Sequence, residues 1–443
     1  MTSTIKKIKP KERDTIIQAL SAGVVPRLGL PYIQVGRAAE IAALLRDIDR
    51  IGDGGASVRF VIGEYGAGKT FFANLIRLIA LERKCVTIHA DLAPDRRIHA
   101  TGGQARALYS EAVRNMATRT KPEGGALAGV VERLVTDSVK EATERKVPVE
   151  QVIDQKLAPI QEFVGGYDFV VVLKAYWKGS EEGNEELKAA ALRWLRGEFS
   201  TKTEARQALG VRTIIDDGDV YDSLKSLACL TRVAGYAGLV VMLDELVNLY
   251  KLQSSQARNQ NFEEILRIVN DALQGNTSGI GFVMCGTPEF LMDTRRGLYS
   301  YEALQSRLAE NRFATGGLVD YSGPILRLQN LTPEDMMVLL TNIRAVFAGG
   351  DPERFLVPDE ALHAFMDHCN KRIGEAYFRT PRTTVKAFVQ MLSVLEQNPT
   401  AKWQDLLGQV EVAPDGPDTQ PTAEGETSYS GEEGDELTKL RLP

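Results

Sequence analysis

The sequence predicts an α/β protein built on a parallel sheet, with a long helical insertion and a C-terminal helical lid. A glycine-rich segment at 63–70 lies between a short β-rich run at 58–62 and an amphipathic helical pattern at 71–81. A later apolar run at 239–243 ends in two carboxylates. Strand, loop and helix in this order are typical of the start of a parallel α/β sheet.

Residues 1–55 are predicted to form a helical lead-in to this sheet. Apolar residues recur at helical spacing at Ile41, Leu44 and Ile48, before a glycine-rich turn. After the first strand and helix, the run at 85–89 has the composition of a second strand.

A long helical insertion is predicted at 103–226, where apolar positions recur every three or four residues. Within it, the apolar run at 169–173 fits either a strand or part of a buried helix, and periodicity alone does not separate the two. Strands at 281–285 and 324–328 complete the sheet. The predicted α/β core therefore comprises two stretches of chain, 56–102 and 227–330.

The C-terminal helical lid is predicted at 331–410. Thr332 is suited to cap its first helix, and Pro333 is suited to the first turn. Helical patterns follow near 333–347, 358–372 and 381–396. Residues 411–443 are rich in Gly, Pro, Thr, Ser and acidic residues, so we expect an acidic disordered tail.

The net charge of the chain is concentrated in this tail. The 443 residues carry a formal net charge of −6. Residues 411–443 contain nine acidic and two basic residues and carry −7, which leaves +1 on the preceding 410 residues. A nearly neutral body does not itself indicate nucleic-acid binding, although it is compatible with a local basic patch.

Composition excludes several classes of protein. A chain with 44% hydrophobic and 25% charged residues is ordinary for a globular protein, not for a collagen-like or largely disordered one. No apolar run approaches the roughly 18–20 residues that cross a bilayer, and no apolar segment follows the N-terminal charges. The four cysteines form no CxxC pair. We therefore expect reduced thiols, no membrane association and a cytoplasmic location.

The segment GEYGAGKT at 63–70 matches the phosphate-loop pattern G-x-x-x-x-G-K-[ST] completely and predicts a P-loop NTPase. Glycines let backbone N–H groups approach a phosphate chain, and the following helix adds its N-terminal dipole. Lys69 is expected to neutralise the β- and γ-phosphates, and Thr70 to bind Mg²⁺. The alternative is a flexible glycine turn. The residues predicted to bind ATP here are Gly63, Glu64, Tyr65, Gly66, Ala67, Gly68, Lys69, Thr70 and Phe71.

Asp244 and Glu245 end the apolar run at 239–243, as expected for acids at the carboxyl edge of a central strand. We expect Asp244 to hold Mg²⁺, mainly through water, and Glu245 to act as general base on the attacking water. One alternative is a helix N-terminus that happens to be acidic. Another is that both acids bind nucleotide without turnover.

Three further side chains are candidates for contacts with the nucleotide. Thr287 follows the strand at 281–285, where it suits either the γ-phosphate and attacking water or the cap of the next helix. Arg307 suits a role in the nucleotide site of a neighbouring subunit, with Arg312 as the competing choice. Arg382 opens the last lid helix, from which it would reach the γ-phosphate, or else it is solvated.

The order of these features resembles that of AAA+ ATPases, in the branch of origin-recognition and STAND-type proteins. A closer resemblance, over about residues 10–410, is to the ATP-binding proteins of bacterial BREX-like phage-defence islands. It is carried by AGVVP, VGR, GEYGAGKTF and ALRWLRG at 22–26, 35–37, 63–71 and 191–197. The resemblance to the origin-recognition and STAND branch implies that Gly36 and Arg37 border the adenine. The closer resemblance to the BREX-like proteins implies assembly with itself or with a helicase, nuclease or methyltransferase that acts on phage DNA.

Two functions remain open at this point. One is an ATPase that uses Mg²⁺ and hydrolysis to drive or gate a DNA-directed defence complex. The other is a nucleotide-dependent interaction switch, in which ATP orders the lid and turnover is only a slow reset. A phosphoryl-transfer kinase is a weaker third hypothesis, because no acceptor site is visible in the sequence. No winged-helix domain is evident after the lid, so DNA contact, direct or through a partner, stays open.

Overall fold

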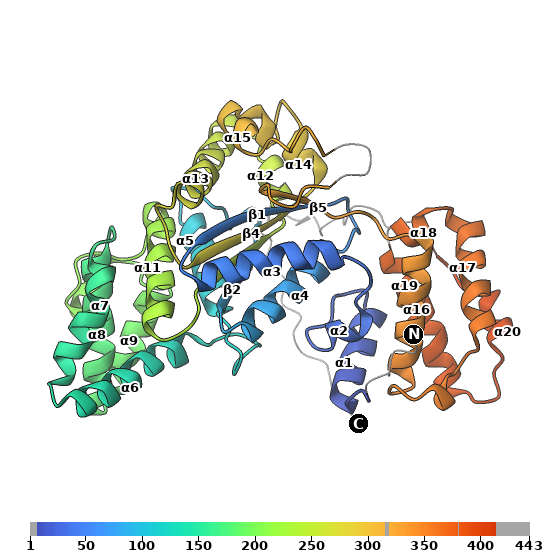
Figure 1. The fold of residues 1–443 in the computed structure, drawn as a ribbon, viewed down its shortest axis with the longest axis horizontal. Helices are drawn as coiled ribbons and strands as arrows, with labels where there is room; N and C mark the ends of the chain where they lie inside the picture. The colour runs from blue at the N-terminus through green and yellow to red at the C-terminus, as the bar shows by residue number, and fades with distance from the viewer. Residues whose placement is uncertain (1–6, 315–318, 380, 413–443) are drawn as a thin grey trace, which may run out of the picture.

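Five parallel strands form the centre of the molecule (Figure 1). The computed structural model describes residues 7–314, 319–379 and 381–412. In sheet order the strands are β2 (Val86–Asp91), β3 (Leu239–Asp244), β4 (Ile280–Gly286), β1 (Ala56–Ile62) and β5 (Ile325–Arg327). The predicted parallel α/β sheet is confirmed.

Helices cover both faces of the sheet, because its strands present apolar side chains on both sides. On β3, Val241 packs into the core on one face and Met242 into the core on the other. The helices on the Met242 face are α3 (Ala38–Gly52) and α4 (Lys69–Glu82). The helices on the Val241 face include α5 (Gln104–Arg114), α11 (Val220–Val233) and α13 (Ser255–Gln274). Burial on both faces explains why the central strands β3 and β4 read as nearly unbroken apolar runs.

Residues 127–209 of the predicted insertion form a helical bundle that extends from one end of the sheet, on the left in Figure 1, whereas α5 and α11, at the two ends of the insertion, cover the sheet. The helices of the bundle are α6 (Leu127–Arg145), α7 (Val149–Gln161), α8 (Gly166–Glu182), α9 (Glu185–Leu195) and α10 (Lys202–Leu209). The ambiguous run at 169–173 lies within α8 and is helical. Phe169 packs edge-on against Trp194 with ring centroids 5.8 Å apart, so its apolar character comes from burial between helices.

A second group of helices lies at the other side of the sheet, on the right in Figure 1. It contains α16 (Pro333–Phe347), α17 (Asp359–Ile373), α18 (Ala376–Arg379), α19 (Pro381–Gln397) and α20 (Trp403–Leu407). The Thr332 hydroxyl accepts a hydrogen bond from the Asp335 amide, and Pro333 occupies the first turn of α16. The predicted cap of this helix is confirmed.

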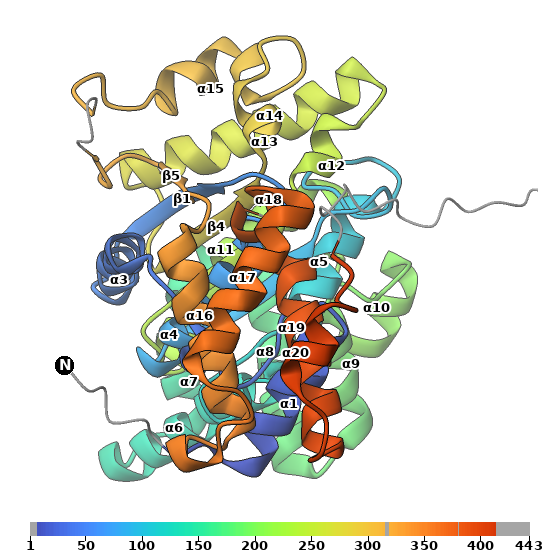
Figure 2. The same cartoon turned by 90° about the vertical axis from the view of Figure 1, so that its right-hand side faces the viewer.

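The N-terminal helices divide between these two parts of the molecule. α1 (Pro10–Ser21) and α2 (Leu30–Ile33) pack against α16 and α19, and Figures 1 and 2 both show α1 beside the C-terminal helices. Ile16 is fully buried in the core that these helices share. α3, by contrast, lies on the sheet. The sequence predicts a single lead-in at residues 1–55. The described part of this segment instead contributes both to the C-terminal helical body and to the sheet.

Three short helices follow β3 and β4: α12 (Val247–Tyr250), α14 (Pro288–Met292) and α15 (Glu302–Arg307). The four cysteines are unpaired, and three of them are buried. No helix in the described ranges is both long and apolar enough to span a membrane. Apart from residues 411 and 412, the predicted acidic tail lies outside the described residues.

A buried ion pair joins α3 to the central strand β1. Asp47 and Arg59 are only 3% and 5% exposed, and the Arg59 guanidinium donates to both oxygens of the Asp47 carboxylate. Arg59 also donates to the Gly323 carbonyl, just before β5. One side chain therefore ties together a helix, a strand and the segment that leads to the edge strand.

Asp47→Ala is expected to lower the free energy of unfolding by about 3 kcal/mol, because it leaves a buried guanidinium without its counter-ion. Chemical denaturation would measure the change. Asp49→Ala, two residues along the same helix, removes an ion pair with Arg83 whose side chains are about half exposed. That control should cost less than about 1 kcal/mol. Equal losses in the two variants would contradict the role given to the buried pair.

Candidate functional site

The glycine-rich segment forms a loop between β1 and α4. Gly66 and Gly68 have φ angles of 79° and 82°, a conformation that residues with a Cβ rarely adopt. Gly63 donates to the Gly286 carbonyl at the end of β4, 3.2 Å away. A Cβ on Gly63 would lie 3.2 Å from that of Ala67, so the loop closes tightly on itself. The glycines therefore determine the loop shape as the motif predicts.

Lys69 is held within this loop. Its Nζ atom donates to the carbonyls of Gly63 and Glu64, each at 2.9 Å. Burial lowers the pKa of Lys69, while the nearby Asp244 carboxylate opposes the shift. An ammonium partly withdrawn from water interacts more strongly with an incoming phosphate than an exposed one does.

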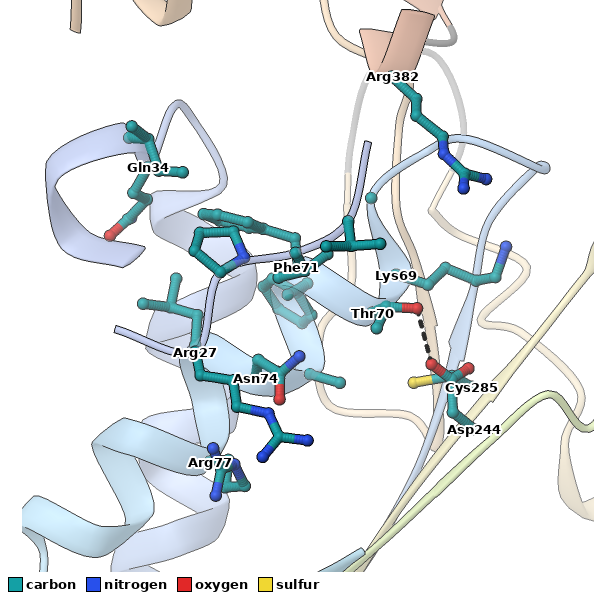
Figure 3. Close-up of a pocket in the computed structure, with 18 of the residues that line it drawn as sticks. Arg27, Gln34, Lys69, Thr70, Phe71, Asn74, Arg77, Asp244, Cys285 and Arg382 are labelled. Atoms are coloured by element: carbon teal, nitrogen blue, oxygen red, sulfur yellow. Dashed lines mark hydrogen bonds between the residues drawn. The ribbon is translucent and has the colours of Figure 1, made fainter. Parts of the chain in front are cut away.

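Thr70 and Asp244 meet although 174 positions separate them in the chain. The Thr70 hydroxyl lies 2.8 Å from Oδ2 of Asp244, as the dashed line in Figure 3 marks. The other carboxylate oxygen of Asp244 accepts the Glu245 amide at 2.8 Å. Glu245 has a φ angle of 58°, so the backbone enters the left-handed region directly after β3.

These oxygens fit a hard divalent cation. Mg²⁺ is usually held by one or two protein oxygens, several waters and substrate phosphates. In the part of the chain that the structure describes, no cluster of three or more His, Cys, Asp or Glu side chains is arranged for a metal. A cation at Thr70 and Asp244 would therefore take its remaining ligands from phosphate and water.

Asp91 is a third carboxylate at this edge, and the sequence analysis missed it. It pairs in register with Asp244 across β2 and β3. Both acids line a cleft that opens beside the phosphate loop. Partial desolvation and then the charge of Asp244 raise the pKa of Asp91. The only sequence signal is an acid directly after an apolar run, as at Asp244. Nothing in the sequence shows that the two strands are neighbours.

Thr287 and Arg307 form hydrogen bonds with groups other than the loop and the acids. The Thr287 hydroxyl accepts the Phe290 amide and caps α14, as the alternative interpretation had it, and Thr287 follows β4 beside β3. Arg307 donates to the side chain of Asn270 and to the Ala303 carbonyl. Neither residue lines the cleft. A role for Arg307 in a neighbouring subunit stays a prediction.

Arg37 supports the loop from outside. Its Nη2 atom donates to the Ala67 carbonyl at 2.7 Å and to the Gln329 carbonyl at 3.0 Å. Burial lowers the pKa of Arg37, against the charges of Glu40 and Asp335. Gly36 precedes it with a φ angle of 63°. Arg37 therefore links the phosphate loop to the segment that leads into α16, and contact with adenine stays a prediction.

A cleft of about 1000 Å³ opens beside the loop, between the sheet and the C-terminal helices. Its walls come from the N-terminal segment, the loop, α4, the ends of β2 and β3, and α19. From α19, Arg382 donates to the Gly23 carbonyl at 2.8 Å and lies 3.4 Å from the Tyr65 hydroxyl. Figure 3 shows Arg382 across the cleft mouth from Lys69 and Thr70. The structure thus brings the predicted loop, acids and lid arginine to one cavity.

Comparison with known families gives one match. A family model described as BREX system ATP-binding protein BrxC/D matches residues 8–411, nearly the whole chain. A search of curated proteins found no match.

Arg37→Ala is expected to weaken nucleotide binding about tenfold, because the loop loses a charged donor that stabilises its closed shape. Isothermal titration calorimetry with a non-hydrolysable ATP analogue would measure it. Arg46→Ala, at an exposed arginine of α3, the helix that Arg37 precedes, is the matched control and should leave affinity unchanged. Undiminished affinity in Arg37→Ala would show that the loop holds its shape without this contact.

Proposed function

The chain belongs to the family of BREX system ATP-binding proteins, and on that basis we propose that it is a magnesium-dependent ATPase. Its hydrolysis of ATP would drive or gate a DNA-directed complex in defence against phage. Membership of the family supports ATP binding and participation in phage defence. The arrangement of side chains in the cleft supports the chemistry.

The contact between Thr70 and Asp244 is the observation that carries this proposal. It brings a hydroxyl from the phosphate loop and a carboxylate from β3 within 2.8 Å, so Thr70 and Asp244 would together hold one divalent cation beside the bound nucleotide. Bound there, Mg²⁺ would neutralise charge that develops on the phosphates. Lys69 would supply a second positive charge for the phosphate oxygens.

Glu245 is the proposed general base. It follows Asp244 directly, has a φ angle of 58° and lines the same cleft. Desolvation in the cleft and the neighbouring Asp244 charge both raise the pKa of Glu245. A carboxylate of raised pKa accepts a proton from water more readily than an ordinary glutamate does.

We further propose an AAA+ type of organisation. In support, β4 lies between β1 and β3, so Thr287 follows the strand beside the acids. A C-terminal helical body also reaches the phosphate loop through Arg382. In that organisation, self-association would bring Arg307 to a neighbouring nucleotide, after release of its contact with Asn270. Alternatively the partner is a helicase, nuclease or methyltransferase, with DNA bound directly or through that partner.

The second candidate function is a nucleotide-dependent interaction switch. The observation that favours it is the position of Arg382, which contacts both the N-terminal segment at Gly23 and the loop at Tyr65. α1, α2 and the C-terminal helices share one core, so they would move together. Nucleotide that engages Arg382 would bias the position of this whole body.

Glu245→Gln is expected to reduce phosphate release from ATP at least a hundredfold while leaving nucleotide affinity close to that of the wild type, because the amide cannot accept the proton. A phosphate-release assay with and without DNA would measure the rates. Glu150→Gln, an exposed residue of the insertion, is the control. Equal rates in Glu245→Gln and wild type would remove Glu245 from the mechanism. Slow hydrolysis in both the wild type and Glu245→Gln, together with ATP-dependent complex formation, would favour the nucleotide-dependent interaction switch.

Asp244→Asn is expected to raise the magnesium concentration needed for half-maximal hydrolysis about tenfold or more, since it removes a charged oxygen ligand. The measurement is phosphate release against Mg²⁺ at fixed ATP, and chelation of the metal should abolish activity in the wild type. Asp91→Asn, on the adjoining strand, is the matched control for loss of one negative charge. Equal shifts in the two variants would assign the effect to overall charge instead of coordination.

A further inference from the structure

The cleft continues past the phosphate loop to a second, basic end. Figure 3 shows Arg27, Asn74 and Arg77 together, away from Lys69 and Arg382. Asn74 and Arg77 follow Thr70 on α4 at intervals of four and three residues, so all three line one face of the helix. At 1.5 Å per residue, Thr70 and Arg77 are separated by about 10 Å along the axis. The basic end of the cleft therefore lies beyond Thr70, away from the loop.

Arg77 is a buried cation at this end. The residue is only 6% exposed, yet it lines the cleft. One guanidinium nitrogen donates to the Pro122 carbonyl at 2.8 Å, while its Nε atom has no hydrogen-bond partner among the described residues. Burial, and then the neighbouring charge of Arg27, lower the pKa of Arg77. Two guanidinium groups thus lie close together in spite of their repulsion.

The surrounding groups compensate this positive charge only in part. Neither Arg27 nor Arg77 forms an ion pair with a described residue, and Glu123 is the one acid that acts on the pKa of Arg77. His89 also lines the cleft, where burial and both arginines lower its pKa to about 4, so it is neutral near pH 7. Asn115 donates to the His89 carbonyl. A buried cation without a counter-ion is costly, and an anion would offset that cost.

We propose that Arg27 and Arg77 form a second anion subsite, which binds a phosphate group separate from the triphosphate at the loop. Paired guanidinium groups are suited to the several oxygens of a phosphate. Because Arg77 is buried inside the cleft, the ligand is a small one, either inorganic phosphate or the terminal phosphate of a small molecule, and not a duplex backbone. This site goes beyond the proposed hydrolysis and does not depend on it.

The test separates this subsite from the phosphate loop. In a Lys69→Ala background, where the loop has lost its phosphate-binding lysine, inorganic phosphate should still bind in a calorimetric titration. Adding Arg27→Ala should weaken that binding at least tenfold. Arg27 is exposed, so its removal should leave folding intact, whereas Arg77→Gln requires a check by circular dichroism. Lys69→Ala combined with Arg46→Ala is the matched control.

A nucleoside 5′-monophosphate, titrated in the same way, distinguishes the two possible ligands of the subsite, inorganic phosphate and the terminal phosphate of a small molecule. Tighter binding than phosphate would indicate the terminal phosphate of a small molecule, and equal or weaker binding would indicate the free anion. Absence of phosphate binding in Lys69→Ala, or binding unaffected by Arg27→Ala, would overturn the subsite. So would Arg27-dependent binding of an oligonucleotide without binding of phosphate. Failure of ATP hydrolysis in the wild type would leave these results unaltered.

Discussion

The parallel direction of the five strands is the constraint on which the candidate site depends. Because all the strands run the same way, their carboxyl ends emerge at one edge of the sheet. β1 brings the phosphate loop to this edge, β3 brings Asp244 and Glu245, and β2 brings Asp91. The 2.8 Å contact between Thr70 and Asp244 results from that alignment. An antiparallel neighbour would carry its acids to the opposite edge.

The cleft beside this edge is closed by parts of the chain that are distant in sequence. α1 and α2 share a core with α16 and α19, so the first and last helical segments form one body. Two arginines connect the phosphate loop to this body. One acts through the segment that leads into the body, and the other lies on the body itself. Arg37 bonds the Ala67 carbonyl, and Arg382 lies against Tyr65. A change in loop shape on nucleotide binding would therefore reach the C-terminal helices through direct hydrogen bonds.

Charge is distributed unevenly along the cleft. Near the loop, the Lys69 ammonium lies among the carboxylates Asp91, Asp244 and Glu245. About two turns further along α4, Arg77 lies beside Arg27 of the N-terminal segment. Glu123 is the acid that raises the pKa of Arg77. The first end suits a cation with phosphate, and the second suits an anion alone. The nearly neutral net charge of the body conceals this separation, because it sums over both ends.

Local chemistry was accessible from the sequence alone. The loop at 63–70, the acids at 244–245 and the cap at Thr332 each depend on residues close together in the chain, and their structures follow from glycine conformation, strand burial and helix capping. The tertiary structure decided strand order, the alignment of Asp91 with Asp244, the union of α1 with the C-terminal helices, and the meeting of Arg27 with Arg77. These arise from packing between distant segments, where each apolar face has several equivalent partners and periodicity does not specify which one it meets.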